Sequence, residues 1–130
     1  MNANGQGRKP TLKPDAQALK RAPQPPKHLD KYAKDEWRRV MPFLIERQIL
    51  TKADLSGVET YCAMVGIIRT VEQNRSENDG VINVPMFGVM NRAATTARQL
   101  AAEFGLTPVS RAKLGGITSD DDDADNPLAV

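Results

Sequence analysis

A long stretch of helical periodicity, residues 52–77, constrains the fold of this sequence more than any other feature. A threonine–lysine–alanine–aspartate box at 51–54 precedes it, with the threonine at the N-cap position and an acidic side chain three residues later. An asparagine–aspartate–glycine run at 78–80 follows it and favours a turn. The sequence therefore predicts one long helix that any packing scheme for the chain has to accommodate.

Two adjoining apolar stripes run along this predicted helix. Together they are wider than the single face that a helix of a small bundle usually buries. Either the helix is central and lies between two others of the same chain, or a neighbouring subunit covers the second stripe. The first stripe holds Leu55, Val58, Cys62 and Val65, and the second holds Tyr61, Met64, Ile68 and Val71.

A shorter helix is predicted before the long one. Asp30 is placed to cap a helix that starts at Lys31, and we expect Pro42 to kink this helix rather than end it. Its apolar residues recur at the spacing of one helical face, which predicts a core-facing side with Trp37 as its anchor. The members of this face are Ala33, Trp37, Val40, Met41 and Leu44.

After the turn at 78–80 the pattern changes. The β-branched residues and bounding glycines of 81–88 predict a short hairpin or an extended excursion, although Pro85 excludes a central strand. A third helix is expected from about Val89, with a narrow alanine-lined stripe and Gly105 beyond its end. Thr107 followed by Pro108 predicts a last short helix. The stripe consists of Ala93, Ala97, Leu100, Ala101 and Phe104.

These elements predict an all-α fold, a small helical bundle with a long central helix, in residues 29–114. Residues 1–28 hold five prolines and few large aliphatic side chains, so we expect a disordered or polyproline-like arm. Residues 115–130 are predicted to be a disordered acidic tail. The net charge is +6 over residues 1–34 and −5 over residues 119–130, although the whole chain carries only +2.

Single occurrences of two residue types exclude several classes of chemistry. Cys62 is the one cysteine and His28 the one histidine, which excludes an intrachain disulfide, a cysteine-based zinc site and a Ser-His-Asp triad. The sequence has no phosphate-binding loop of the ATPase type. We therefore expect no enzymatic activity, no metal site and no cofactor. No apolar run is long enough for a membrane span or a signal peptide, which points to a reducing cytoplasm.

The basic arm suits a polyanion such as double-stranded DNA. Lys31, Lys34 and Arg38 extend the positive charge onto the first helix, where their spacing puts them on one side. The alternative is that these charges only keep the helix soluble. The candidate DNA-binding residues are Arg8, Lys9, Lys13, Lys20, Arg21, Lys27, Lys31, Lys34 and Arg38.

The order of these motifs resembles the small terminase subunit of tailed double-stranded DNA phages, in the subfamily found with cos-type packaging. The resemblance spans about residues 7–114 and departs from the family pattern in the apolar run 81–90. Four pieces carry it: Gly7-Arg8-Lys9-Pro10, then Glu36-Trp37-Arg38-Arg39, then Leu50-Thr51-x-x-Asp54-Leu55 with Tyr61-Cys62, and finally Phe104-Gly105-Leu106-Thr107-Pro108-x-Ser110-Arg111.

The resemblance implies a function that composition does not. Small terminase subunits form homo-oligomeric rings, bind the viral genome, and recruit or stimulate the large terminase subunit, which carries the ATPase and the nuclease. The resemblance also implies that the protein is located in the host cytoplasm. A small helical adaptor or antitoxin-like protein that binds a protein partner is the alternative. A helix-turn-helix repressor is a weaker one, because the segment after Leu50 lacks a glycine turn.

Overall fold

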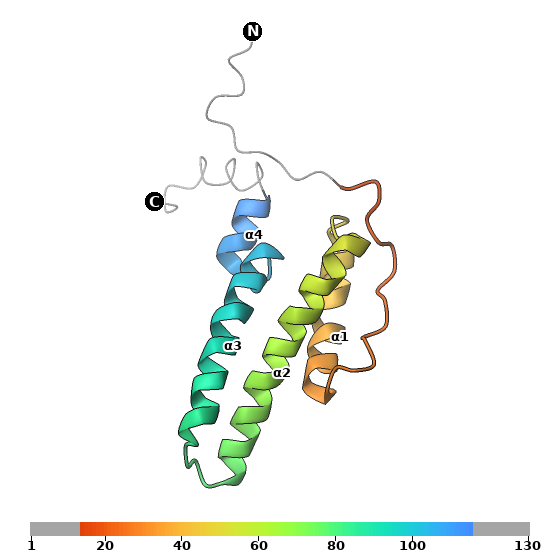
Figure 1. The fold of residues 1–130 in the computed structure, drawn as a ribbon. Helices are drawn as coiled ribbons and strands as arrows, with labels where there is room; N and C mark the ends of the chain where they lie inside the picture. Colours follow the sequence, from red (N-terminus) through yellow and green to blue (C-terminus); the bar gives the residue numbers. More distant parts are fainter. Residues whose placement is uncertain (1–13, 116–130) are drawn as a thin grey trace, which may run out of the picture.

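The computed structural model describes residues 14–115, with side chains to Lys113, and every regular element in this part of the chain is a helix (Figure 1). The predicted all-α fold is confirmed, and no strand occurs between residues 14 and 115. The structures expected for residues 1–13 and for the tail from 116 onward lie outside the described residues. The helices are α1 (Lys31–Glu46), the single 3₁₀ turn η2 (Lys52–Asp54), α2 (Leu55–Glu77), α3 (Val84–Glu103) and α4 (Pro108–Gly115).

The long helix α2 lies between α1 and α3 and packs against both (Figure 1). α2 and α3 form an antiparallel hairpin, and α1 runs beside the first half of α2. The far end of the hairpin therefore extends beyond α1, and we call residues 71–90 the hairpin tip. This arrangement is the first of the two explanations for the wide apolar surface of α2, a central helix between two others of one chain.

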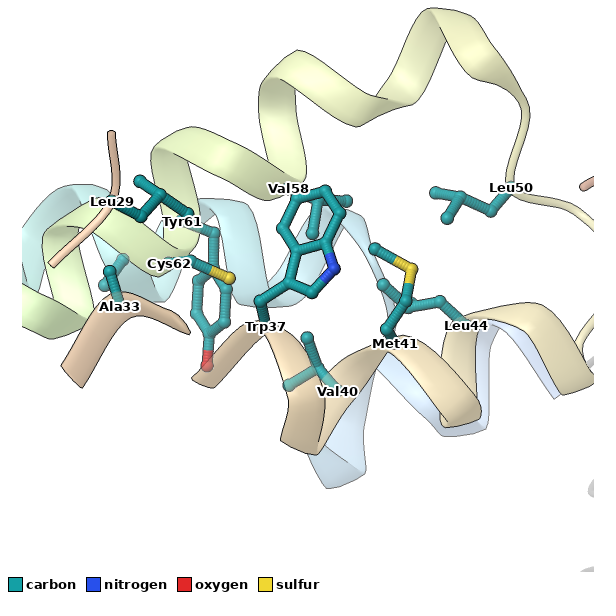
Figure 2. Close-up of a cluster of buried hydrophobic side chains, with 11 residues drawn as sticks. Leu29, Ala33, Trp37, Val40, Met41, Leu44, Leu50, Val58, Tyr61 and Cys62 are labelled. Carbon is teal, nitrogen blue, oxygen red and sulfur yellow. The ribbon is translucent and has the colours of Figure 1, made fainter. Parts of the chain in front are cut away.

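Most of the core lies between α1 and the first half of α2 (Figure 2). The predicted apolar face of α1 is confirmed, since all five of its members are buried. Trp37 projects from α1 toward Val58 of α2, and Cys62 is fully enclosed beside it. Leu29 and Leu50, which flank α1 in sequence, close the two ends of this cluster.

Local capping residues set the helix boundaries. The Asp30 carboxylate accepts a hydrogen bond from the Ala33 amide at 2.8 Å, and the Asp54 carboxylate accepts one from the Thr51 amide at 2.9 Å. Both caps agree with the sequence prediction. α1 continues through Pro42 to Glu46, so the proline does not end it. Gly105 follows α3 with a φ of 68°, a left-handed conformation that glycine adopts without strain.

The predicted hairpin or extended excursion at 81–88 is wrong. α3 begins at Val84, about one and a half turns earlier than predicted, and it includes Pro85 in its first turn. A proline is tolerated there because the first amides of a helix have no intrahelical acceptor. Asn83 caps the helix, since its side-chain oxygen accepts a hydrogen bond from the Met86 amide at 3.2 Å. The β-branched residues favour an extended segment, but the Asn83 cap starts a helix at Val84 instead.

Residues 14–28 form no regular element, yet they keep defined contacts with the helices. The Asp15 and Leu19 amides donate to the Gln48 and Leu50 carbonyls, each at 2.8 Å. The Trp37 indole N–H donates to the Pro23 carbonyl, also at 2.8 Å. Leu19 packs against the core. These contacts hold residues 14–28 against the helical bundle, and the segment runs beside α1 in Figure 1.

The two glycines of α2 mark its closest approaches to neighbouring segments. A β-carbon at Gly66 would lie 2.9 Å from the Asp30 carboxylate and 3.1 Å from the Ala33 β-carbon. A β-carbon at Gly57 would lie 2.9 Å from the Phe104 ring, just beyond the end of α3. The alanine stripe of α3 serves this same packing, since Ala93 and Ala97 are buried. The stripe is used within the chain.

Candidate interaction surfaces

The predicted DNA-binding residues divide between two segments. Arg8, Lys9 and Lys13 lie outside the described residues. Lys20, Arg21 and Lys27 are exposed on the arm, Lys31 and Arg38 are exposed on α1, and Lys34 is half-buried. Because Trp37 is hydrogen-bonded to Pro23, the arm passes directly beside this part of α1.

Arg38 shows how close the two segments are. It lines a shallow pocket together with arm residues 22–25 and with Pro42. Its guanidinium lies 3.7 Å from the Asp35 carboxylate, a partly compensating contact between two exposed side chains. The structure therefore places Arg38 against the arm, whereas Lys20 lies beside Glu46 in the last turn of α1. The sequence alone could not establish these positions.

A second basic feature, which the sequence analysis missed, surrounds a buried carboxylate. Glu36 of α1 is 1 % exposed and accepts four hydrogen bonds. Arg39 donates two of them, from Nε at 2.8 Å and from Nη2 at 2.6 Å. The Tyr61 hydroxyl donates at 2.5 Å and Arg69 Nη2 at 3.1 Å. We call these four residues the Glu36 cluster. A signal did exist, because Glu36 falls on the buried face between Ala33 and Val40.

The Glu36 cluster fixes the protonation of its members. Burial opposes ionisation of Glu36, but the hydrogen bonds from Arg39 and Tyr61 outweigh it and lower the pKa of the carboxyl. Burial, together with the hydrogen bond to Glu36, raises the pKa of Tyr61 to about 12. The pKa of Arg39 is raised, chiefly because Glu36 accepts its hydrogen bonds. At neutral pH the cluster therefore holds one negative and two positive charges.

The hairpin tip exposes a group of apolar side chains. Val84 is 77 % exposed, the side chains of Val81 and Ile82 are also largely accessible, and that of Phe87 is partly exposed. Val81, Ile82 and Phe87, with Met86 and Met90, line a narrow groove against the end of α2. Large exposed apolar groups gathered at one end of a small protein are typical of a contact surface.

The cysteine of this chain lies in the core. Burial raises the pKa of the Cys62 thiol to about 12, so the thiol is protonated and inaccessible. From residue 14 to residue 115, no three histidine, cysteine, aspartate or glutamate side chains come together as metal ligands do. Within the same stretch, none of the helices combines the length and the apolar character that crossing a membrane requires.

Between residues 14 and 115 the fold is a small helical bundle, with exposed cations on the arm and on α1 and exposed apolar side chains at the hairpin tip. A comparison with models of protein families matches residues 33–121 to the phage terminase small subunit. This match covers more than half of the chain, and the chain belongs to that family. A search of curated proteins gave no match. A search of solved structures gave none either.

Proposed function

We propose that this protein binds double-stranded DNA as a ring-shaped homo-oligomer and recruits or stimulates the large terminase subunit during genome packaging. Membership of the small-subunit family supports a role in phage packaging. The observation that carries the DNA-binding proposal is the set of exposed cations on the arm and on α1, with Arg38 lying against the arm. The proposal includes the absence of enzymatic activity, the host cytoplasm as location and the cos-type packaging subfamily.

The arm and α1 cations suit contacts with phosphates rather than with bases. Lys20, Arg21 and Lys27 lie on a segment without regular structure, which offers little fixed geometry for reading base edges. We therefore propose weak sequence preference and a strong dependence on salt. In a ring each subunit repeats the same cations, so that modest contacts multiply through avidity.

Duplex binding measured at several salt concentrations tests this proposal. The logarithm of the affinity should fall with the logarithm of the salt concentration, with a slope of about −0.9 for each phosphate neutralised. Replacing Lys31, Lys34 and Arg38 by glutamate should weaken binding to all duplex sequences alike and leave the oligomer intact. Deleting residues 1–28 should make the salt dependence weaker still, with a slope of smaller magnitude. Salt-insensitive binding, or affinity unchanged in both variants, would contradict the proposal.

Two observations support the proposal of a ring: membership of the family, and apolar surface that the single chain leaves exposed. The hairpin tip extends beyond α1 and exposes Val81, Ile82 and Val84, so it is free to contact a second copy of the chain. A ring needs a heterologous interface that closes on itself, in which one surface of a subunit meets a different surface of the next. We propose the hairpin tip and the outer side of α2 as parts of that interface.

The alternative, a helical adaptor that binds a protein and not DNA, makes opposite predictions. An adaptor would be a monomer or a dimer and would show no salt-dependent affinity for duplexes. Its exposed apolar residues at the hairpin tip would serve the protein partner. Binding to a duplex of arbitrary sequence therefore separates the two hypotheses in one titration.

A further inference from the structure

We propose that Arg39 and Arg69 form a fixed binding site for a backbone phosphate of DNA, and that the buried Glu36 carboxylate acts as the positioning residue of this site. The inference builds on the proposed DNA binding and adds a contact that differs in kind from the arm. The described cations of the arm are exposed side chains on a segment without regular structure. Arg39 and Arg69 are instead oriented by their hydrogen bonds to the buried Glu36 carboxylate.

The geometry leaves donors free on both arginines. Arg39 uses Nε and one Nη2 hydrogen to hold Glu36, so three of its five N–H groups remain. Arg69 gives Glu36 a single hydrogen bond from Nη2. The side chains of Arg39 and Arg69 are 62 % and 42 % exposed, respectively, whereas that of Glu36 is 1 % exposed. The carboxylate is thus buried, whereas the two arginine side chains that bind it are largely accessible to solvent.

The charge balance of the Glu36 cluster favours an anion. One carboxylate is paired with two guanidinium groups, which leaves one positive charge in excess. The neighbouring acids do not remove it, because Asp35 lies beside Arg38 and Glu72 pairs with Arg75. Pairs of arginine forks match the oxygen geometry of a phosphate, and a fork that is already oriented loses less entropy on binding.

Tyr61 makes the arrangement rigid. Figure 2 shows its ring extending from α2 to α1, where its hydroxyl donates to Glu36. The carboxylate is therefore held by α1 and α2 together, and Arg39 and Arg69 come one from each helix. A site assembled across the α1–α2 interface exists only when these helices are packed. It is thus a property of the fold, unlike the charge of the arm.

The same side of α1 continues as a basic surface. Arg39, Phe43 and Arg47 are spaced four residues apart and so share one side of the helix. Arg47 lies over the exposed Phe43 ring at 5.3 Å. Burial and the positive charge of Arg111 lower the pKa of Arg47. A DNA backbone that contacts Arg39 could therefore also contact the cation of Arg47 on the same side of α1.

Arg75 supplies a matched control on the same helix. Its side chain is 44 % exposed, close to the 42 % of Arg69, and it pairs with Glu72, an exposed carboxylate. Arg69→Gln and Arg75→Gln therefore remove the same charge from similarly exposed positions of α2. They differ in that Arg69 belongs to the Glu36 cluster and Arg75 to the hairpin tip, so affinities are compared only when light scattering shows both variants assembled as the wild type is.

Duplex binding by the full chain at low salt tests the inference, with circular dichroism and light scattering to check fold and assembly. Arg69→Gln should lower the affinity at least about tenfold and reduce the magnitude of the salt slope by about 0.9 for each contacting subunit. Arg75→Gln should change the affinity less than about twofold. Arg69→Lys, which keeps the charge but loses the fork, should fall between the wild type and Arg69→Gln.

The outcomes separate this inference from the proposed function. Salt-dependent binding by the wild type with equal losses in Arg69→Gln and Arg75→Gln would overturn the Glu36 cluster as a site and leave DNA binding standing. A purely structural role would lower the stability of Arg69→Gln and leave the affinity of the folded protein unchanged, which would also overturn it. Absence of duplex binding by the wild type would overturn both.

Discussion

The two halves of the α2–α3 hairpin have the same secondary structure and different surroundings. Near the start of α2, α1 and the arm cover the helix, and the side chains of Val58, Tyr61 and Cys62 are buried. At the hairpin tip, two helices face solvent and Val81, Ile82 and Val84 are exposed. We call the first region, together with α1 and the arm that cover it, the packed half. The comparison shows that this chain concentrates its own stability at one end and leaves apolar surface at the other.

This difference assigns different roles to the two regions. The packed half holds the buried core, the Glu36 cluster and the cations of α1, so it both stabilises the chain and presents its basic surface. The hairpin tip contributes little to the stability of a single subunit. It exposes apolar surface that a neighbouring molecule would bury. We expect substitutions in the packed half to change stability, and substitutions in the hairpin tip to change assembly.

Removing one aromatic side chain from each region should give the largest contrast. Trp37→Ala deletes a buried indole and its hydrogen bond to Pro23, and should lower the free energy of unfolding by about 3–5 kcal/mol. Phe87→Ala removes a partly exposed ring of the hairpin tip and should cost less than about 1 kcal/mol. Urea denaturation of both variants measures this, under conditions where the protein is dissociated. Equal losses would erase the proposed difference between the regions.

An added charge should break assembly at the hairpin tip and not elsewhere. Val84→Asp places a carboxylate at a position that is 77 % exposed in the single chain, so the helices should stay folded while the oligomer dissociates to smaller species. Val109→Asp on α4, at 68 % exposure, is the matched control and should leave the mass unchanged. Size-exclusion chromatography with light scattering gives both masses. An intact Val84→Asp oligomer would rule out the hairpin tip as an interface.

Alkaline pH should weaken the packed half through two groups. The pKa of Tyr61 is raised to about 12 and that of Cys62 to about 12, so the folded state holds both protons more tightly than the unfolded chain does. Their contribution to stability is complete below about pH 9 and is lost as the pH rises toward 12. Each group should contribute a slope of about 1.4 kcal/mol per pH unit in its range.

Urea denaturation between pH 8 and pH 11 measures that slope. Cys62→Ala should remove the loss that begins near pH 9, and Tyr61→Phe the loss that begins near pH 10. The Tyr61→Phe variant should also be less stable at pH 7, by about 1–2 kcal/mol, because Glu36 loses a hydrogen bond. A wild-type stability that stays constant from pH 8 to pH 11 would show that neither group is held as described.

The acidic tail should have the smallest effect on folding. A chain that ends at Leu114 loses five aspartates and almost no apolar surface, so its free energy of unfolding should change by less than about 0.5 kcal/mol. Its affinity for DNA should rise, because the tail no longer competes for the basic arm. A full-length control with the five aspartates replaced by asparagine should bind equally well. Failed assembly or weaker DNA binding in the truncated chain would contradict this prediction.

The sequence predicted the elements whose signals are local and periodic. The spacing of Ala33, Trp37 and Val40 marked the buried face of α1, and the Thr51 box marked the start of the long helix. It failed where short-range preferences compete. Val81, Ile82 and Val84 favour a strand by composition, but the Asn83 cap and a proline tolerated in the first turn start a helix instead.

Long-range contacts account for the other differences. The attachment of the arm depends on Trp37 reaching the Pro23 carbonyl, 14 residues away in sequence. The Glu36 cluster joins residues 25 and 33 positions apart, because Tyr61 and Arg69 come from α2. No periodicity in one helix shows which side chain of another helix will meet it. The buried position of Glu36 was visible in the pattern, but its partners were not.

The mass of the wild-type protein in solution tests the central claim most directly. A subunit whose apolar hairpin tip extends beyond its own core should be found with that surface covered. Light scattering at micromolar concentration should therefore give one species of many times the 14.3 kDa chain mass, consistent with a closed ring. A monomer of 14.3 kDa at that concentration would contradict the claim, because the exposed hairpin tip would then need no second copy of the chain.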